Sequence, residues 1–422
     1  MRILHLTQTD AGNGAGAAAH RLHRAMLDQG ADSRMLAGIR RSSDPTVGSA
    51  AGGRAWPLVA TAANARLARA AGATGGLFSA SRVSYARLDP AEVAAADAVV
   101  LHWITGGFMG PRDIARLRGR RVFWRLSDIW PFSGGCHYPG DCTRYHESCG
   151  ACPMLGSGRA HDLSRLEWRA KRRAYEGLDL TVVAPSRWIG DCARASSLFG
   201  GRPVVHIPTG VETDIFRPRD KALARELLGL PRDRRIVLFG ALGATADSRK
   251  GYRYLRDTLK HLAARPERSG AALHLAVFGG DRWAPKGEEG RLPLPASWIG
   301  RLHDRIALAL LYSAADVLVA PFLEDNLPNV VLEAAACGLP VAAFDTGGLP
   351  DAVRHQETGW LAPLRDSASL AEGIAWIVED GARHAALSAA ARSVAERTFS
   401  IDGCAREWLR LLDPAASGGA PA

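Results

Sequence analysis

No run of about 20 apolar residues, the length that a membrane-spanning helix requires, occurs in the 422-residue sequence. The sequence also shows no internal repeat of short, fixed period. The first residues, Met1–Gln8, are strand-like and lead directly into a glycine-rich loop, so we expect no secretory signal. These absences exclude a membrane-spanning helix and a short-repeat array. We expect a cytoplasmic protein, with peripheral contact to the inner membrane face left open.

Length and charge leave several partner classes open. The chain is about twice as long as a usual domain, and 47% hydrophobic with 23% charged residues is typical of a globular protein. A net charge of +10 favours nucleotide diphosphates, polyprenyl-diphosphate lipids, anionic membranes or nucleic acid, although an ordinary solvated surface also explains it. The apolar stretch Trp56–Ala71 contains Arg66 and Arg69. We favour a helix packed on the core there over a helix lying on an anionic membrane.

Apolar runs alternate with helical spacing along the chain, which predicts an α/β fold with parallel, doubly wound sheets. The predicted strands are Arg2–Leu6, Arg34–Ala37, Ala98–Leu101, Arg121–Trp124, Leu180–Ala184, Val204–Ile207, Arg235–Gly240, Ala272–Phe278, Asp316–Ala320 and Val341–Phe344. We expect five regions, in chain order: an N-terminal domain 1–207 with a cysteine-rich loop 134–154, a hinge 208–220, a C-terminal domain 221–390, a helical segment 391–413 packing back on the first domain, and a disordered tail 414–422.

The segment Asp316–Val353 carries the strongest functional signal. Acidic and glycine residues follow its two predicted strands, where the carboxyl ends of a parallel sheet gather ligands. They are Glu324, Asp325 and Asn326 after the first strand, Glu333 in the next helix, and Gly347 and Gly348 after the second strand. Carboxylates suit sugar hydroxyls, and glycine lets the backbone approach a diphosphate. The segment therefore predicts a nucleotide-sugar site, with an ordinary βαβ unit bearing surface acids as the alternative.

Asp325 and Glu333 stand eight residues apart, with ACGLPV and GGLPD following. This pattern resembles the E-x7-E signature of retaining glycosyltransferases of family 4, and the stretches VVAPSRWIGDCARASSLFG and VVHIPTGVETDIFRP resemble that family's link between domains. The resemblance implies the GT-B fold, in which two Rossmann-like domains face a central cleft. The first acid of the signature is aspartate here, which leaves open whether Asp325 or Glu324 contacts the donor sugar. Glu333 is implied to hold the nucleotide ribose.

A Lys-Gly pair at the start of a predicted helix suits the phosphates of a donor. The resemblance implies that Lys250 binds the diphosphate, and family members also carry an arginine where this chain has Thr245. Arg249 is the candidate to replace that arginine. An arginine-lysine pair at a helix start is also a common structural feature.

The loop after the first predicted strand contains Gly12, Gly14 and Ala17 in a G-x-G-x-x-A pattern. We favour a loop in which Gly14 lets the donor phosphates or the acceptor approach. An NADP site is the alternative, with Arg40 or Arg41 on the 2′-phosphate.

Four of the seven cysteines, Cys136, Cys142, Cys149 and Cys152, fall within 17 residues. With His137 as an alternative ligand, they predict a structural zinc site. Reduced thiols packing a loop, or a disulfide or redox role, are the other interpretations. The stretch resembles a subgroup of family 4 transferases from bacterial exopolysaccharide gene sets, of the colanic-acid type.

Asp128 and His102 are candidate acceptor-side groups that bind the acceptor or accept its hydroxyl proton. Many relatives have histidine at the position of Ser127. His102 also fits a hydrogen-bonded histidine near the core, and the same ambiguity applies to His137.

The resemblance implies a retaining glycosyltransferase of surface polysaccharide synthesis that needs no cofactor for transfer. Its substrates are a nucleotide-diphosphate sugar and a saccharide or polyprenyl-diphosphate-linked acceptor. The alternatives are a nucleotide-sugar epimerase, a non-catalytic partner subunit and a basic zinc protein that binds nucleic acid. No aromatic-basic strand module or recognition helix occurs, so we expect no nucleic-acid partner.

Overall fold

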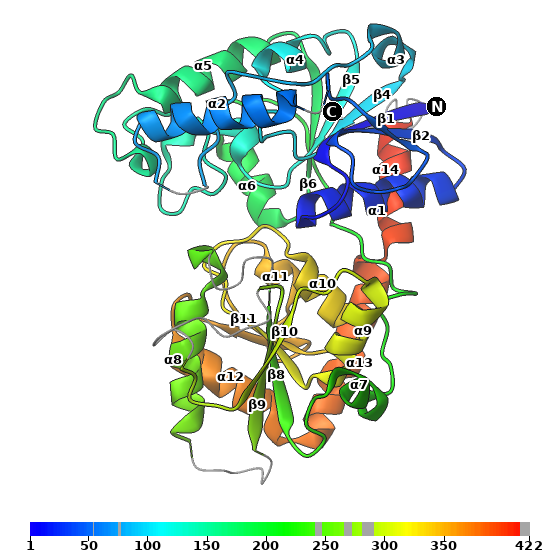
Figure 1. The fold of residues 1–422 in the computed structure, drawn as a ribbon, viewed down its shortest axis with the longest axis vertical. Helices are drawn as coiled ribbons and strands as arrows, with labels where there is room; N and C mark the ends of the chain where they lie inside the picture. Colours follow the sequence, from blue (N-terminus) through cyan, green and yellow to red (C-terminus); the bar gives the residue numbers. More distant parts are fainter. Residues whose placement is uncertain (54, 75–76, 241–246, 266–271, 281–290, 414–422) are drawn as a thin grey trace. The chain divides into compact units, whose positions relative to one another are not determined.

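The chain folds into two compact units (Figure 1). Unit 1 comprises residues 1–208 and the chain from 404 on, and unit 2 comprises residues 209–403. The chain therefore leaves unit 1 once and returns to it. The computed structural model describes residues 1–53, 55–74, 77–240, 247–265, 272–280 and 291–413. The predicted tail 414–422 and Thr245 lie outside these residues.

Unit 1 is built on a parallel sheet with the strand order β3-β2-β1-β4-β5-β6-β7. Its strands are β1 Arg2–Thr9, β2 Asp32–Ile39, β3 Val47–Ser49, β4 Ala98–Leu101, β5 Arg121–Arg125, β6 Asp179–Ala184 and β7 Val204–His206. Its helices are α1 Gly14–Asp28, α2 Trp56–Ala70, α3 Pro90–Ala95, α4 Pro111–Ala115, α5 Leu163–Tyr175 and α6 Arg187–Ala195, with 3₁₀ turns η1 Trp130–Phe132, η2 Arg144–His146 and η3 Pro153–Leu155. Every residue of β4 is buried, as expected for a parallel strand covered by helices on both faces.

The last helix, α14 (Ile401–Leu412), returns the chain to unit 1. Trp408 and Leu412 on this helix are fully enclosed. Arg121 of β5 donates a hydrogen bond from Nη1 to the Leu412 carbonyl oxygen at 2.7 Å. The preceding helix, α13 (Gly381–Thr398), belongs to unit 2.

Unit 2 contains a second parallel sheet, with the strand order β10-β9-β8-β11-β12-β13. Its strands are β8 Arg235–Gly240, β9 Leu273–Phe278, β10 Ala296–Gly300, β11 Val317–Ala320, β12 Val341–Phe344 and β13 Gly359–Ala362. Its remaining elements are α7 Lys221–Leu228, η4 Ser248–Lys250, α8 Tyr252–Ala263, α9 Arg305–Ala314, α10 Asn329–Ala336, α11 Leu349–Ala352 and α12 Ser367–Glu379. The strand order reverses between β8 and β11, which is where ligands bind in doubly wound sheets.

One buried carboxylate ties the first elements of unit 2 together. Asp316, just before β11, accepts hydrogen bonds from Arg225 Nη2 at 2.7 Å, from Lys221 Nζ at 3.0 Å and from the Ile236 N–H at 2.6 Å. Burial alone raises the pKa of Asp316, but Lys221, the Ile236 N–H and Arg225 outweigh it and hold the pKa below its ordinary value. Asp316 therefore stays ionised and fastens α7 and β8 to β11.

We expect Asp316→Asn to lower the free energy of unfolding of unit 2 by about 3 kcal/mol, because Arg225 then loses its buried counter-charge. Urea unfolding of the full chain measures the change. Asp214→Asn, at an exposed position of unit 2, is the control and should change stability by less than about 0.5 kcal/mol. Equal effects of the two substitutions would contradict the role given to Asp316.

Candidate functional site

The site in unit 2 lies on the loop that follows β11, residues 321–326, which we call the β11 loop. Its neighbour is the turn formed by η4 and Gly251. The Leu323 N–H donates a hydrogen bond to the Arg249 carbonyl oxygen at 2.8 Å. Gly251 has φ +70°, and a Cβ there would lie 1.8 Å from the Pro321 carbonyl oxygen. Only glycine therefore allows this turn to lie directly on the β11 loop.

The two segments bring Lys250 and Asp325 into an ion pair. Lys250 Nζ lies 2.5 Å from Asp325 Oδ2 and 4.4 Å from the centre of the Phe322 ring. Both charged side chains are largely enclosed, with exposed fractions of 15% and 11%. An enclosed cation beside a carboxylate can bind a phosphate and a hydroxyl side by side.

A second glycine turn closes the β11 loop from the other side. The Gly348 N–H donates to the Asp325 carbonyl oxygen at 3.0 Å, so this amide is used within the protein. Gly347 has φ +56°, and a Cβ there would lie 2.2 Å from the same oxygen. Thr346 Oγ1 donates to the Leu323 carbonyl oxygen at 3.1 Å. The structure thus brings Lys250, Asp325 and the Gly347–Gly348 turn together.

Glu333 lies in the second turn of α10 and is buried. Tyr312 on α9 donates a hydrogen bond to Glu333 Oε2 at 3.0 Å. Asn326 is also buried, and its N–H donates to Asp325 Oδ1 at 2.9 Å. Tyr312 was not predicted as part of the site. A tyrosine four residues before a predicted strand gives no local signal of its contact with a carboxylate 21 residues later.

Arg249 and Glu324 are placed differently from Lys250. Arg249 Nη2 lies 2.6 Å from Asp247 Oδ2, within its own turn, and Nη1 approaches the Glu324 carbonyl oxygen at 3.5 Å. Glu324 is half-buried. The Arg249 guanidinium therefore forms an ion pair with Asp247 and holds the β11 loop through the backbone.

In unit 1, Asp128 follows β5 and is almost fully enclosed. Its Oδ2 accepts hydrogen bonds from Trp103 Nε1 at 2.9 Å and from His137 Nδ1 at 2.7 Å. His137 Nε2 lies 2.7 Å from the hydroxyl of Ser79, which is half-buried. The carboxylate requires the proton on Nδ1, so in the neutral ring Nε2 accepts from Ser79. The result is a continuous chain of hydrogen bonds from Asp128 through His137 to Ser79, which sequence analysis did not predict.

A buried lysine fixes the loop between Asp128 and His137. Lys171 on α5 donates to the carbonyl oxygens of Trp130 and, at 3.1 Å, Ser133. Its Nζ also lies 3.7 Å from the centre of the Trp130 ring. Burial lowers the pKa of Lys171 to about 8, although Glu167 opposes this shift. Tyr175, one turn further on, donates to the Pro131 carbonyl oxygen at 2.7 Å.

His102, the other acceptor-side candidate, lies inside unit 1. It is 1% exposed, and its Nε2 lies 2.9 Å from His5 Nδ1, with the two rings stacked. Burial, and then the neighbouring His5, hold the pKa of His102 well below its ordinary value. This environment matches the interpretation of a hydrogen-bonded core histidine and keeps the ring neutral.

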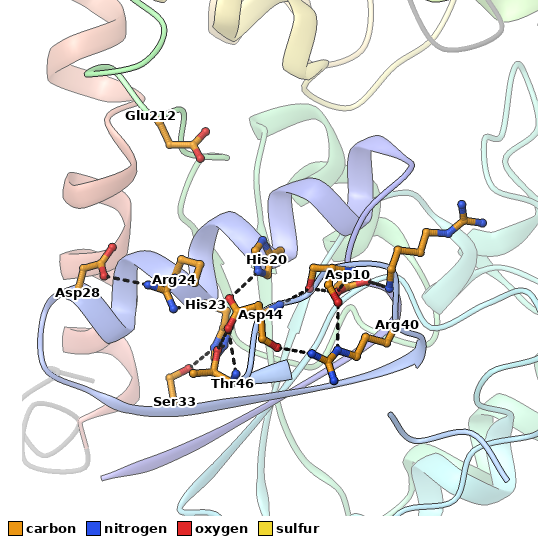
Figure 2. A network of polar contacts seen from close by, with 12 residues as sticks. Asp10, His20, His23, Arg24, Asp28, Ser33, Arg40, Asp44, Thr46 and Glu212 are labelled. Atoms are coloured by element: carbon orange, nitrogen blue, oxygen red, sulfur yellow. Dashed lines mark hydrogen bonds and ion pairs between the residues drawn. The ribbon is translucent and has the colours of Figure 1, made fainter. Parts of the chain in front are cut away.

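Two histidines of α1 extend this group: the His23 ring lies 5.5 Å from the His5 ring, and the His20 ring lies 6.4 Å from that of His23 (Figure 2). His23 lies 2.8 Å from both Ser33 Oγ and Thr46 Oγ1, and His20 Nε2 lies 2.9 Å from Asp44 Oδ2. Burial, and then His20, lower the pKa of His23 to about 4. Burial alone raises the pKa of Asp44, but hydrogen bonds from Thr46 and His20 outweigh it and lower the pKa.

The glycine loop 10–14 leads from β1 into α1, and Gly14 is the first residue of the helix. Asn13 caps the helix by accepting from the Gly16 N–H. Arg40, a candidate for an NADP phosphate, donates instead to the carbonyl oxygens of Ser42 and Asp44 (Figure 2). Its guanidinium is therefore engaged in the loop that follows β2.

The four loop cysteines line one small cavity with Phe78 and Tyr145. Burial raises the pKa of Cys149 to about 11 and also raises the pKa of Cys136 and Cys152, so these thiols stay protonated. All four are free thiols. Cys142 is half-buried.

The prediction of a structural zinc is not supported. Within residues 1–413, apart from the gaps given above, no group of three or more His, Cys, Asp or Glu side chains is positioned to hold a metal ion. His137 is not turned toward a metal either, because Asp128 and Ser79 engage both of its ring nitrogens. Cysteine spacing suggested a ligand set, but spacing alone does not determine how close the thiols lie to one another.

Comparison with known proteins places these features in context. Residues 233–380 match the family model described as "Glycosyl transferases group 1". The chain is 33% identical over 217 residues to D-inositol 3-phosphate glycosyltransferase 2 of Catenulispora acidiphila, a match that covers 48% of this chain and 50% of that protein. The chain thus spans about half the length of the curated relatives that it matches.

Solved structures match over nearly the whole chain. Sucrose-phosphate synthase from Thermosynechococcus elongatus superposes with a TM-score of 0.66 at 20% identity, covering 99% of this chain and all of that one. Anabaena HepE, solved in complex with UDP-glucose, gives a TM-score of 0.63 at 17% identity, with 98% and 99% covered. The predicted GT-B fold class of two parallel-sheet α/β domains is confirmed.

The buried histidines predict acid sensitivity of unit 1. In the folded state, the pKa of His5, His23 and His102 lies below 6.5, the ordinary pKa of a histidine side chain. The unfolded chain therefore binds more protons as pH falls below about 6.5, and stability is lost from there down, for His23 to about pH 4. Each histidine contributes up to about 1.4 kcal/mol per pH unit. Urea unfolding followed at stepped pH measures the slope.

His23→Asn should reduce the slope of unfolding free energy against pH by up to about 1.4 kcal/mol per pH unit, which corresponds to one proton. His261→Asn, at an exposed position of α8, should leave the slope unchanged. A stability of unit 1 that stays constant from pH 7 to pH 4 would overturn the expectation.

Proposed function

We propose that this protein is a retaining glycosyltransferase that moves a sugar from a nucleotide-diphosphate sugar to an acceptor. The observation that carries the proposal is the enclosed Lys250–Asp325 pair, held between two glycine turns where the strand order of unit 2 reverses. The matched segment 233–380 contains this pair and Glu333. The proposed donor site is supported by two observations together: the family match covers these residues, and they form an enclosed ion pair.

In the proposed site, Lys250 offers its charge to the departing nucleoside diphosphate. Its present partner, Asp325, is then available to accept hydrogen bonds from donor sugar hydroxyls, with Glu324 as the neighbouring candidate. Stabilisation of developing charge by a preorganised donor is worth roughly 3 kcal/mol in an enclosed site. Arg249 contributes by holding the β11 loop, because its guanidinium already pairs with Asp247.

Glu333 is proposed to bind the nucleotide ribose. Tyr312 holds Oε2, which fixes the orientation of the carboxylate. Asn326 fixes the orientation of Asp325 through its N–H. Gly347 supports the close approach of the backbone, whereas the Gly348 N–H is already used by the Asp325 carbonyl oxygen.

For the acceptor side we propose the Asp128–His137–Ser79 chain of unit 1. His137 supplies a histidine beside Asp128, although residue 127 is serine. The Ser79 hydroxyl is the half-buried end of the chain, so an acceptor hydroxyl would meet it first. Asp128 acts through His137 rather than directly, because both of its oxygens are engaged.

The proposal also extends to the nucleotide base of the donor, the acceptor and the biosynthetic role. HepE was solved with UDP-glucose, which makes UDP-sugars the first donors to test. The inositol-phosphate transferases suggest inositol 3-phosphate as one acceptor. We also propose saccharides linked to polyprenyl diphosphate, a role in surface exopolysaccharide synthesis of the colanic-acid type, a cytoplasmic location and a hinge at 208–220. A nucleotide-sugar epimerase on the same fold is the alternative.

Donor binding can be tested by thermal stabilisation, since a ligand that binds only the folded state raises the unfolding midpoint. We expect one of UDP-, GDP- or dTDP-sugars to raise the midpoint of the wild type. Lys250→Ala should abolish the shift, and Glu333→Gln should reduce it while keeping a hydrogen bond from Tyr312. Lys260→Ala and Glu357→Gln, both at exposed positions, are the matched controls.

If no nucleotide sugar shifts the midpoint of the folded wild type, the donor site is wrong. If the donor alone is converted to a second nucleotide sugar without an acceptor, the protein is an epimerase. Binding without any turnover would support a non-catalytic subunit.

The acceptor-side proposal predicts that His137→Ala lowers transfer about 100-fold and leaves donor binding unchanged. The donor that gives a thermal shift is used, with inositol 3-phosphate and polyprenyl-diphosphate-linked saccharide as acceptors, and product formation is measured across pH. His146→Ala, in the same loop region but exposed, is the control. Transfer at the wild-type rate in His137→Ala would rule out this role.

A further inference from the structure

Helix α2 is attached to unit 1 by a narrow face of small and polar residues. The buried residues of the helix are Pro57, Ala60, Asn64 and Ala68. Asn64 Nδ2 donates to the Val83 carbonyl oxygen at 2.7 Å, and Asn64 Oδ1 accepts from the N–H groups of Arg82 and Val83. Trp56 adds a hydrogen bond from Nε1 to the Ser84 carbonyl oxygen at 3.2 Å, whereas Leu58 and Val59 are not among the buried residues of the helix.

Two large apolar residues of the helix, Leu58 and Val59, point away from the unit. Leu58 is 74% exposed and Val59 is 49% exposed. At 100° per residue, Leu58 and Val59 lie on the side of the helix opposite Asn64, together with exposed Arg66 and Arg69 about two to three turns further on. The outward face of α2 is thus apolar in its first turn and basic in its last turns.

The sequence around this face has charge of one sign. No Asp or Glu occurs from residue 45 to residue 88, while Arg66, Arg69, Arg82 and Arg87 do. An exposed apolar patch with adjacent arginines matches an amphipathic helix that lies in the headgroup region of a membrane. A symmetric pairing of two copies through this face would supply no carboxylate from the segment to either arginine.

We propose that α2 is a docking helix for an anionic lipid surface. Leu58 and Val59 enter the boundary between headgroups and acyl chains, and Arg66 and Arg69 pair with lipid phosphates. The described chain contains no helix long and apolar enough to cross a bilayer, so contact through α2 is peripheral. This surface is independent of the transferase proposal, because none of its residues belongs to either candidate site.

The full chain can be tested by co-sedimentation with phosphatidylcholine vesicles, with and without phosphatidylglycerol. We expect binding to the phosphatidylglycerol vesicles, weakened by high salt. Arg66→Gln with Arg69→Gln should lower the affinity about 30-fold, since each basic residue near an anionic surface contributes about a factor of five. Leu58→Asp with Val59→Asp should lower it at least as much.

The matched control is Leu223→Asp with Leu227→Asp, because these leucines on α7 are similarly exposed, at 52% and 62%. Binding of this control should equal that of the wild type, and circular dichroism should show every variant folded. No binding by the wild type, equal binding to both vesicle types, or binding that survives the α2 substitutions would overturn the proposal. So would a dimer in light scattering that Leu58→Asp dissociates.

Discussion

The parallel pairing of β8 with β11 is the constraint on which the site in unit 2 depends. Strands β9 and β10 continue the sheet on one side of this pair and β12 and β13 on the other. The crossover connections therefore diverge, and the loop after β11 emerges where they separate. Turns from both neighbours then pack on that loop, which brings Lys250 to Asp325 across 75 residues of sequence.

In unit 1, buried side chains of α5 hold the loop that follows β5 in place. The chain after β5 has little regular structure, but α5 holds three of its carbonyl groups through Lys171 and Tyr175. A buried ammonium group is stable there because carbonyl oxygens and the Trp130 ring replace its water. The loop is held in place by these contacts, and both ring nitrogens of His137 are engaged, Nδ1 by Asp128 and Nε2 by Ser79.

Most of the fold could be predicted because buried parallel strands appear in sequence as short apolar runs. Strands β3, β10 and β13 were not predicted, because Val47–Ser49, Ala296–Gly300 and Gly359–Ala362 are only partly buried and give no such run. The grouping of Lys250, Asp325 and the Gly347–Gly348 turn could be predicted because each follows a predicted parallel strand, and the carboxyl ends of parallel strands lie at the same edge of a sheet. The Ser79–His137 contact joins residues 58 apart through an irregular loop, and no sequence period encodes that path.

The return of the chain to unit 1 has a consequence for how the protein is made. Unit 2 occupies one continuous stretch, 209–403, whereas the core of unit 1 needs Trp408, which is synthesised later. During translation unit 2 can complete its fold first. The core of unit 1 lacks the Trp408 side chain until α14 has left the ribosome. Of the two units, the one whose synthesis begins earlier is therefore the later one to complete its fold.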